Sequence, residues 1–151
     1  MAFPSIVPRL SCTVACLLVA LLVAPRPTCA APATAQALEG AWRLVAGEYV
    51  DGNGHVTDYA RERVEGVKVL GDGHFAFTTT RAGAFWAGGS GTFETDGTHY
   101  VEAPRMASYP LVEGGRYRFS YVLEGDTWTL ERHEDGKRVE REVWRRVDAA
   151  R

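Results

Sequence analysis

The stretch LEGAWRLV, residues 38–45, marks the point where an Ala-rich leader gives way to alternating sequence. It places Trp42 two positions after Gly40, in the first segment with a period of two. From there on, Asp-Gly, Gly-Asp and Gly-Gly pairs recur at short intervals, and such pairs accept the positive φ of tight hairpin turns. They lie at 51–54, 71–73, 88–91, 95–97, 124–126 and 134–136. The pattern predicts a chain of β-hairpins.

The segments between these turns are rich in Thr, Val, Tyr, Phe and Trp and alternate polar with apolar residues. They predict an all-β fold, a single up-and-down antiparallel meander. A meander of eight or more strands normally curls and closes into a barrel, because closure removes its exposed edges. No internal repeat follows residue 38, so we expect one domain over 38–148. Two segments fit less well: 56–66 is compatible with a helical turn capped by Thr57 or Asp58, and 103–115 with a long loop at the rim.

Residues 1–30 have the pattern of an export signal that is cleaved. Arg9 precedes an apolar run at 13–24, which is shorter than the about 20 residues that span a membrane. Small residues follow, and cleavage after Ala30 fits best. The cleavage alternatives are Ala31 and Ala35, and a retained N-terminal anchor is the other interpretation, which Pro25 and Pro27 disfavour.

The leader interpretation has consequences for location and composition. We expect a periplasmic or secreted protein with a flexible segment at 31–37 and no stable membrane anchor after cleavage. All three cysteines lie within 1–30, so disulfides are not expected in the exported domain. Residues 1–30 hold two arginines and no acid, so the 17 basic and 19 acidic residues of the whole chain become 15 and 19, a net charge of −4. This charge disfavours nucleic acid as a partner, and we expect a monomer.

A Gly-x-Trp on the first strand of an antiparallel barrel is also a signature of lipocalins. The chain resembles the lipocalin-like domain of small exported bacterial proteins over 38–147, and this resemblance implies a calycin-type barrel of eight to ten strands. The blocks that carry the resemblance, in order, are LEGAWRLV, EGVKVLGDGHFAF, GSGTFETDGTHYVE, SYPLVEGGRYRFSYVLEGDTWTL and REVWRRV. Fatty-acid-binding relatives hold a carboxylate with Arg-x-Tyr on the last strand, but the last strand here has no tyrosine.

The resemblance implies that Trp42 packs at the closed end of the barrel against a basic residue of the last strand, Arg145 or Arg146. Alternation along the strand favours Arg145, because it then shares the inner face with Val143. A guanidinium stacked on an indole contributes roughly 0.5 to 2 kcal/mol. Gly40, Trp42 and Arg145 are therefore expected to be structural, not ligand-binding.

The same alternation predicts which side chains point into the barrel. The inward faces are largely aromatic, and the last strand is expected to point Arg141 inward while Glu140 and Glu142 form a solvated face. The candidate ligand-binding residues are Tyr100, Tyr117, Phe119, Tyr121, Trp128, Arg132 and Arg141.

Two interpretations of this inward set remain open. In the first, aromatic walls hold a small apolar or anionic amphipathic molecule, and Arg132 or Arg141 meets its anionic head group. In the second, the barrel is filled, these arginines pair with Glu102 or emerge at the rim, and the protein is an interaction module that works through its rim loops 81–91 and 103–115. An exposed patch around Phe85, Trp86 and Tyr109 would favour the second.

No motif predicts catalysis or a cofactor. The four histidines are scattered, with no His-x-His or His-Glu-x-x-His, so no metal site is expected. GGSGT around Ser90 lacks the second glycine and the helix of a nucleophile elbow. We therefore expect a protein that is not an enzyme.

We predict that Trp42→Ala lowers the free energy of unfolding by about 3 to 5 kcal/mol, as burial of a large aromatic side chain implies. Urea denaturation measures the change. A variant that keeps its stability but loses ligand binding would contradict the structural role.

Overall fold

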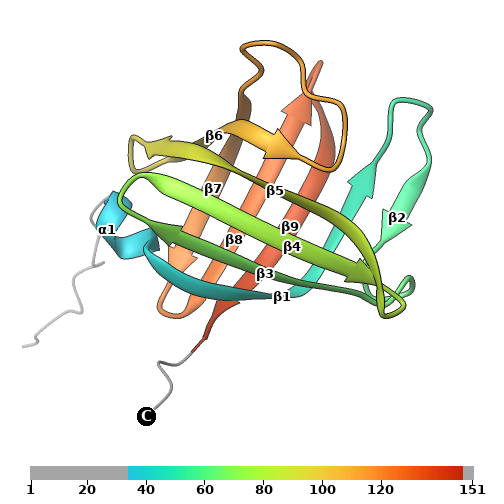
Figure 1. The fold of residues 1–151 in the computed structure, drawn as a ribbon, viewed down its shortest axis with the longest axis horizontal. Helices are drawn as coiled ribbons and strands as arrows, with labels where there is room; N and C mark the ends of the chain where they lie inside the picture. The colour runs from blue at the N-terminus through green and yellow to red at the C-terminus, as the bar shows by residue number, and fades with distance from the viewer. Residues whose placement is uncertain (1–33, 148–151) are drawn as a thin grey trace, which may run out of the picture. The chain divides into compact units, whose positions relative to one another are not determined.

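The computed structural model describes residues 34–147, so the leader expected at 1–30 lies outside the described residues. One short helix, α1 (Ala35–Leu38), precedes nine strands (Figure 1). The strands are β1 (Gly40–Val50), β2 (Val56–Asp58), β3 (Val64–Gly71), β4 (His74–Arg81), β5 (Ala84–Thr95), β6 (His99–Ala107), β7 (Tyr117–Glu124), β8 (Thr127–Glu134) and β9 (Lys137–Arg146).

The strands form a closed antiparallel barrel. From β3 to β9 each strand pairs with the next in sequence, and β1 pairs with both β3 and β9, which closes the sheet. The short β2 pairs with the far end of β1 and is additional to the eight strands of the barrel. The predicted all-β meander that closes into a barrel is confirmed. Within residues 34–147, no helix is long and apolar enough to cross a membrane.

The segments that fitted the strand pattern less well differ in their outcomes. After β2 the chain makes a turn in which the Asp58 carboxylate accepts a hydrogen bond from the Arg61 N–H at 2.9 Å, so the predicted cap at Asp58 is present. The expected loop at 103–115 is shorter, because β6 continues to Ala107. Its Pro104 lies beside a bulge opposite Gly91, where a missing N–H is tolerated. At the other end of the domain, part of the segment expected to be flexible belongs to α1.

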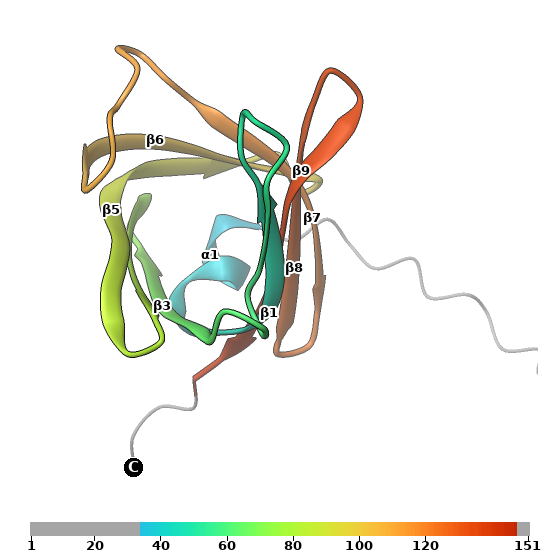
Figure 2. The same cartoon turned by 90° about the vertical axis from the view of Figure 1, so that its right-hand side faces the viewer.

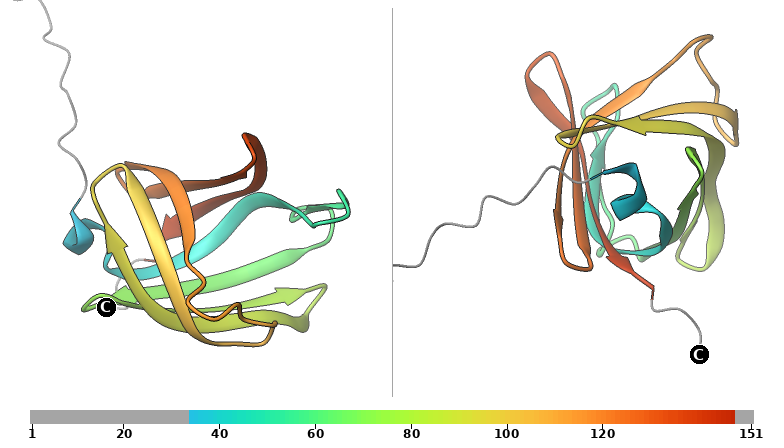
Figure 3. Two further views of the ribbon diagram at one scale, coloured as in Figure 1. Left: turned by 90° about the horizontal axis from the view of Figure 1, so that it is seen from above. Right: turned by 90° about the vertical axis from the view of Figure 1, so that its left-hand side faces the viewer.

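One end of the barrel is covered by α1, as the view from the opposite end shows (Figure 2) and the view from the α1 side repeats (Figure 3). We call this the closed end. The indole N–H of Trp42 donates to the Leu38 carbonyl at 2.8 Å, and the Arg146 guanidinium lies 4.1 Å from the centre of the Trp42 ring. Arg146 also donates to the carbonyls of Ala37 and Glu39, both at 2.6 Å. The last strand is thereby tied to α1 and to the start of β1.

Gly40 is required by this arrangement. Its φ is +121°, and a Cβ there would lie 3.1 Å from a guanidinium nitrogen of Arg146. The partner of Trp42 is Arg146 and not the favoured Arg145, which is exposed. The register explains the difference, because Trp42 lies directly opposite Arg146 and Arg145 is opposite Arg43.

The prediction of which residues of the last strand point inward is also wrong, because the observed alternation is shifted by one residue. Trp144 is 1 % exposed, so its face, which includes Glu140 and Glu142, points inward. Arg141 lies on the outer face, 3.6 Å from Glu131. Trp144 determines which face of β9 points inward, against Val139 and Val143 on the other face. Burying its indole removes more apolar area from water than burying either valine.

Aromatic side chains fill the half of the barrel next to the closed end. The ring of Tyr100 lies 5.4 Å from Phe93, 6.2 Å from Phe119 and 5.0 Å from Trp128, measured between ring centres. Trp128 in turn lies 5.3 Å from Trp42. This half is packed, which leaves only the opposite half free for a ligand.

We predict that Arg146→Lys lowers the free energy of unfolding by about 1 to 3 kcal/mol, because a lysine cannot stack on the indole and bond two carbonyls at once. Arg145→Lys, one residue away on the outer face, should change it by less than about 0.5 kcal/mol. Urea denaturation of both variants checks this. Equal losses would mean that Arg146 has no special role in closing the barrel.

Candidate functional site

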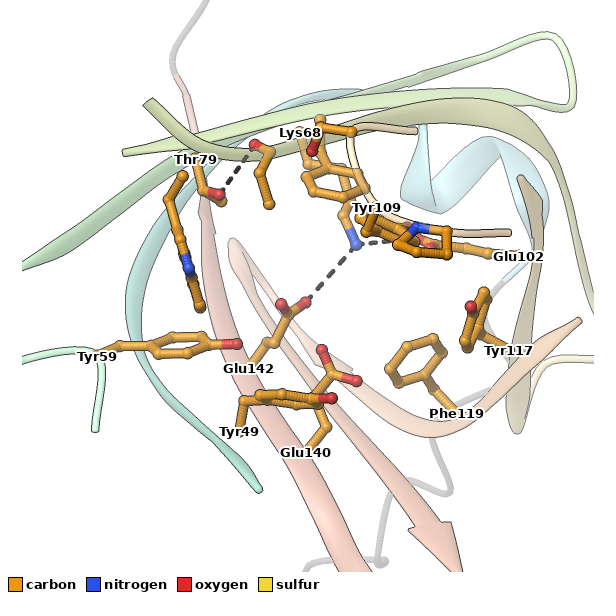
Figure 4. A pocket seen from close by; sticks show the side chains of 15 residues that line it. Tyr49, Tyr59, Lys68, Thr79, Glu102, Tyr109, Tyr117, Phe119, Glu140 and Glu142 are labelled. Atoms are coloured by element: carbon orange, nitrogen blue, oxygen red, sulfur yellow. Dashed lines mark hydrogen bonds and ion pairs between the residues drawn. The ribbon is translucent and has the colours of Figure 1, made fainter. Parts of the chain in front are cut away.

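A cavity of about 470 Å³ occupies the half of the barrel away from the closed end. Its volume lies within the range of about 300 to 1,000 Å³ that is typical of small-molecule sites. The strands β1, β3, β4, β5, β6, β7 and β9 contribute to its wall, together with the turn after β2 and the loop after β6 (Figure 4). The lining residues are Tyr49, Tyr59, Lys68, Phe77, Thr79, Trp86, Ala87, Glu102, Ser108, Tyr109, Pro110, Tyr117, Phe119, Glu140 and Glu142.

Lys68 lies at the bottom of this cavity, only 3 % exposed. Its ammonium is 2.9 Å from Glu102 Oε1 and 3.6 Å from Glu142 Oε2. Burial acts to lower the pKa of Lys68, but the charges of Glu102 and Glu142 outweigh it and raise the pKa above its usual value. Lys68 therefore stays charged at every physiological pH.

The rings around Lys68 extend the packed half of the barrel. Its ammonium lies 5.0 to 5.8 Å from four ring centres, a range that favours cation–π attraction. The Tyr100 hydroxyl donates to Glu102 Oε1 at 2.9 Å, and burial followed by the charge of Glu102 raises the pKa of Tyr100 well above its usual value. Glu102 Oε1 therefore accepts one hydrogen bond from the Lys68 ammonium and one from the neutral Tyr100 hydroxyl.

Sequence reasoning did not identify Lys68 as a site residue. In β3 it stands between Val67 and Val69, both of which are 49 % exposed. The signal that could have identified it is the phase of the strand: Val64 and Leu70 are buried and share the face of Lys68. By composition the two valines would be placed inside and the lysine outside. The opposite is observed, because Lys68 has carboxylate partners inside the barrel.

Glu140 forms the second charged group of the cavity. The Arg132 Nε donates to Glu140 Oε2 at 2.8 Å, and the same guanidinium also bonds Glu134 at the end of β8. Burial, and then the charge of Glu142, raise the pKa of Glu140 to about 7, although Arg132 acts in the opposite direction. The charged groups and tyrosines that interact with Glu140 are Tyr49 of β1, Tyr59, Lys68 of β3, Tyr109 of the loop after β6, Arg132 of β8 and Glu142 of β9.

This pairing corrects the expected role of the arginines. Arg132 points inward, but two carboxylates occupy its guanidinium. Arg141 lies outside the barrel beside Glu131 and does not reach the cavity. Neither arginine is available for an anionic head group. Glu140 and Glu142, expected on a solvated face, line the cavity instead.

The aromatic candidates divide between the cavity and the packed half. Tyr117 and Phe119 line the cavity. Tyr100 and Trp128 are fully buried beneath it, and Tyr121 is buried with its hydroxyl 3.0 Å from Thr95 Oγ1. The inward direction predicted for all five side chains is therefore observed, although only two of them reach the cavity.

Aromatic residues that the sequence did not single out for binding complete the open end. Tyr59 is 5 % exposed and packs edge-on against Trp86, with 5.9 Å between ring centres. Gly47 makes room for it, because a Cβ at Gly47 would lie 2.6 Å from the Tyr59 ring. Trp86 and Tyr109, expected in an exposed rim patch, also line the cavity, whereas Phe85 is 64 % exposed.

Comparisons with known proteins place the chain in no family. Neither a protein-family model nor a curated protein sequence matches it. Among solved structures, the REP1-NXSQ fatty acid transporter is similar with a TM-score of 0.43 and 10 % identity, over 75 % of this chain and 98 % of that chain. A similarity at this level does not carry the transporter's function to this chain. The architecture itself is a closed antiparallel β-barrel.

We predict that Glu140→Gln changes how stability depends on pH. The pKa of Glu140 in the folded state, about 7, lies above its ordinary value of 4.5, so the folded state holds this proton more tightly than the unfolded state. The stability that this proton contributes is complete below about pH 4.5 and is lost as the pH rises through about 7, a loss on the order of 3 kcal/mol. Glu140→Gln should remove that part of the decline between pH 5 and pH 8.

Urea denaturation at a series of pH values measures the decline, and the difference between the two proteins cancels the other titrating groups. Glu124→Gln, at an exposed position at the end of β7, is the control and should follow the wild type. Parallel curves for wild type and Glu140→Gln would show that the pKa of Glu140 is not raised.

Proposed function

We propose that the protein binds a small apolar or amphipathic molecule inside the barrel. The observation that carries the proposal is the cavity of about 470 Å³, which is lined by seven aromatic side chains and a few polar groups. Apolar walls with a small number of convergent polar groups are the usual lining of ligand sites. The aromatic walls supply contact area, and the polar groups orient the ligand.

The packed half of the barrel supports a binding role by making the cavity rigid. Lys68, Tyr100 and Trp128 form a buried layer under the cavity, held by ion pairs and ring contacts. A site that is formed before the ligand arrives loses little conformational entropy on binding. No step of the proposal requires covalent chemistry, and we propose a binding protein and not an enzyme.

The alternative, a filled barrel that acts through its rim loops 81–91 and 103–115, requires a packed interior. The cavity does not meet that condition, and two of the three aromatic residues expected in a rim patch, Trp86 and Tyr109, face inward. We therefore favour the interior as the functional surface. From the leader pattern at 1–30 we further propose that the protein acts in the periplasm or outside the cell, as a monomer.

We predict that the neutral probe N-phenyl-1-naphthylamine binds in the cavity and gains fluorescence there. Ala87→Trp should weaken binding by about tenfold or more, because Ala87 lines the cavity and an indole at that position would fill it. Ala84→Trp, on the same strand at an exposed position, should leave binding unchanged.

Fluorescence titration measures both affinities, and thermal melts check that each variant is folded. Absence of probe binding to the wild type, or equal binding by both variants, would exclude the interior as the site.

A further inference from the structure

The cavity carries more negative than positive charge. Three carboxylates face it, and two cations contact them: Lys68 bonds Glu102 and lies near Glu142, and Arg132 bonds Glu140. The other carboxylate beside Arg132 is 63 % exposed at the end of its strand and belongs to the rim. When these five side chains are all ionised, one negative charge has no cation of its own.

Glu142 is the carboxylate with the weakest countercharge. The Lys68 ammonium is nearer to Glu102, at 2.9 Å, than to Glu142, at 3.6 Å, and Glu140 has a guanidinium at 2.8 Å. The hydrogen bond that Glu142 accepts at 2.8 Å comes from the indole of Trp144, which is neutral. Its side chain is only 12 % exposed, so water screens this charge poorly.

Tyr59 provides a second, independent feature beside Glu142. Its ring is buried, its hydroxyl lines the cavity, and no hydrogen bond joins that hydroxyl to another of residues 34–147. Figure 4 shows this hydroxyl pointing into the cavity toward Glu142. Burial raises the pKa of Tyr59 far above its ordinary value, so the group stays a neutral hydroxyl. A hydroxyl that opens into the cavity is available to hydrogen-bond to a ligand there.

Aromatic rings surround the same point. Tyr49 and Tyr59 both interact electrostatically with the Glu140 carboxylate, and Trp86 packs against Tyr59. Phe119 lines the cavity from β7. The faces of such rings attract cations, most strongly where water is excluded. Carboxylates and ring faces together select a positively charged group attached to an apolar body.

We propose that the ligand carries a protonated amine, or a similar organic monocation, on an aromatic or apolar body, and that its charged group is held by Glu142, Glu140 and the Tyr59 hydroxyl oxygen. The inference rests on the proposed binding function of the cavity. An ammonium has three N–H donors, which these three acceptors can receive, and its charge neutralises the excess of the cavity.

Two other ligand classes fit less well. An anionic ligand would add a second uncompensated negative charge to a poorly solvated site. A metal ion needs several ligands in a fixed geometry, and the described part of the chain contains no group of three or more His, Cys, Asp or Glu side chains placed to hold one.

The test uses three indoles of similar size that differ in charge: tryptamine as the cation, 3-ethylindole as the neutral probe and indole-3-propionate as the anion. Each competes with N-phenyl-1-naphthylamine for the purified wild-type protein at pH 8. Tryptamine should bind at least about tenfold more tightly than either of the others, as cation–π and charge pairing at a desolvated site imply. Equal affinities, or a preference for the anion, would overturn the inference.

Variants locate the charged group. Glu142→Gln and Tyr59→Phe should each reduce the preference for tryptamine over 3-ethylindole to within about threefold, because each removes an acceptor for the ammonium. Glu124→Gln, the exposed control with the same loss of charge as Glu142→Gln, should keep the preference. If a variant also fails to bind N-phenyl-1-naphthylamine, its cavity is no longer intact. The affinities of the wild type for the three indoles then decide the question.

The outcomes separate the two proposals. If the wild type does not bind N-phenyl-1-naphthylamine or any of the indoles, the binding function fails. If it binds the naphthylamine without preferring tryptamine, the binding function stands and the cationic ligand fails. Displacement of tryptamine by Ca²⁺ alone at millimolar concentration would assign the carboxylates to an inorganic cation and overturn the inference.

Discussion

The interior of this barrel depends on one buried ammonium. Lys68 is held between two carboxylates and four aromatic rings, at the boundary between the packed half of the barrel and the cavity. A charge in that position is tolerated only because its partners are already in place, since an isolated ion in an apolar interior would be unstable by many kcal/mol. Glu102 and Glu142 together carry two negative charges against the single positive charge of Lys68. The requirement that stabilises Lys68 therefore also produces the acidic character of the cavity above it.

The barrel separates stability from selectivity along its axis. At the closed end, Trp42 and Arg146 join the first and last strands through a ring stack and backbone carbonyls. At the open end the side chains are titratable, and burial together with the charge of Glu142 raises the pKa of Glu140, so ionising it at neutral pH costs free energy. A packed apolar half can offset that cost, which is a common relation between a scaffold and a strained site.

The sequence predicted the barrel but not the chemistry of its interior, for a physical reason. Turn residues and alternation are local, so the hairpins and the inward aromatic faces could be predicted from them, while the closed end at Trp42 was implied by the resemblance to lipocalins. Alternation defines two faces of a strand without saying which is inside. On the last strand Trp144 competes with two valines, and only pairing with β1 and β8 settles the choice. Lys68 and Glu142 were missed because their buried partners lie on other strands.

The contacts of Arg146 also set the order of events in folding. This residue bonds carbonyls 107 and 109 positions earlier in the chain, and β9 pairs with β1 along most of its length. Such contacts cannot form until nearly the whole domain has emerged from the ribosome. Closure of the barrel therefore has to wait for the last strand, which is a slow route typical of proteins dominated by contacts distant in sequence. A nascent chain of this kind stays open late in synthesis and keeps its unpaired strand edges exposed until the final segment arrives.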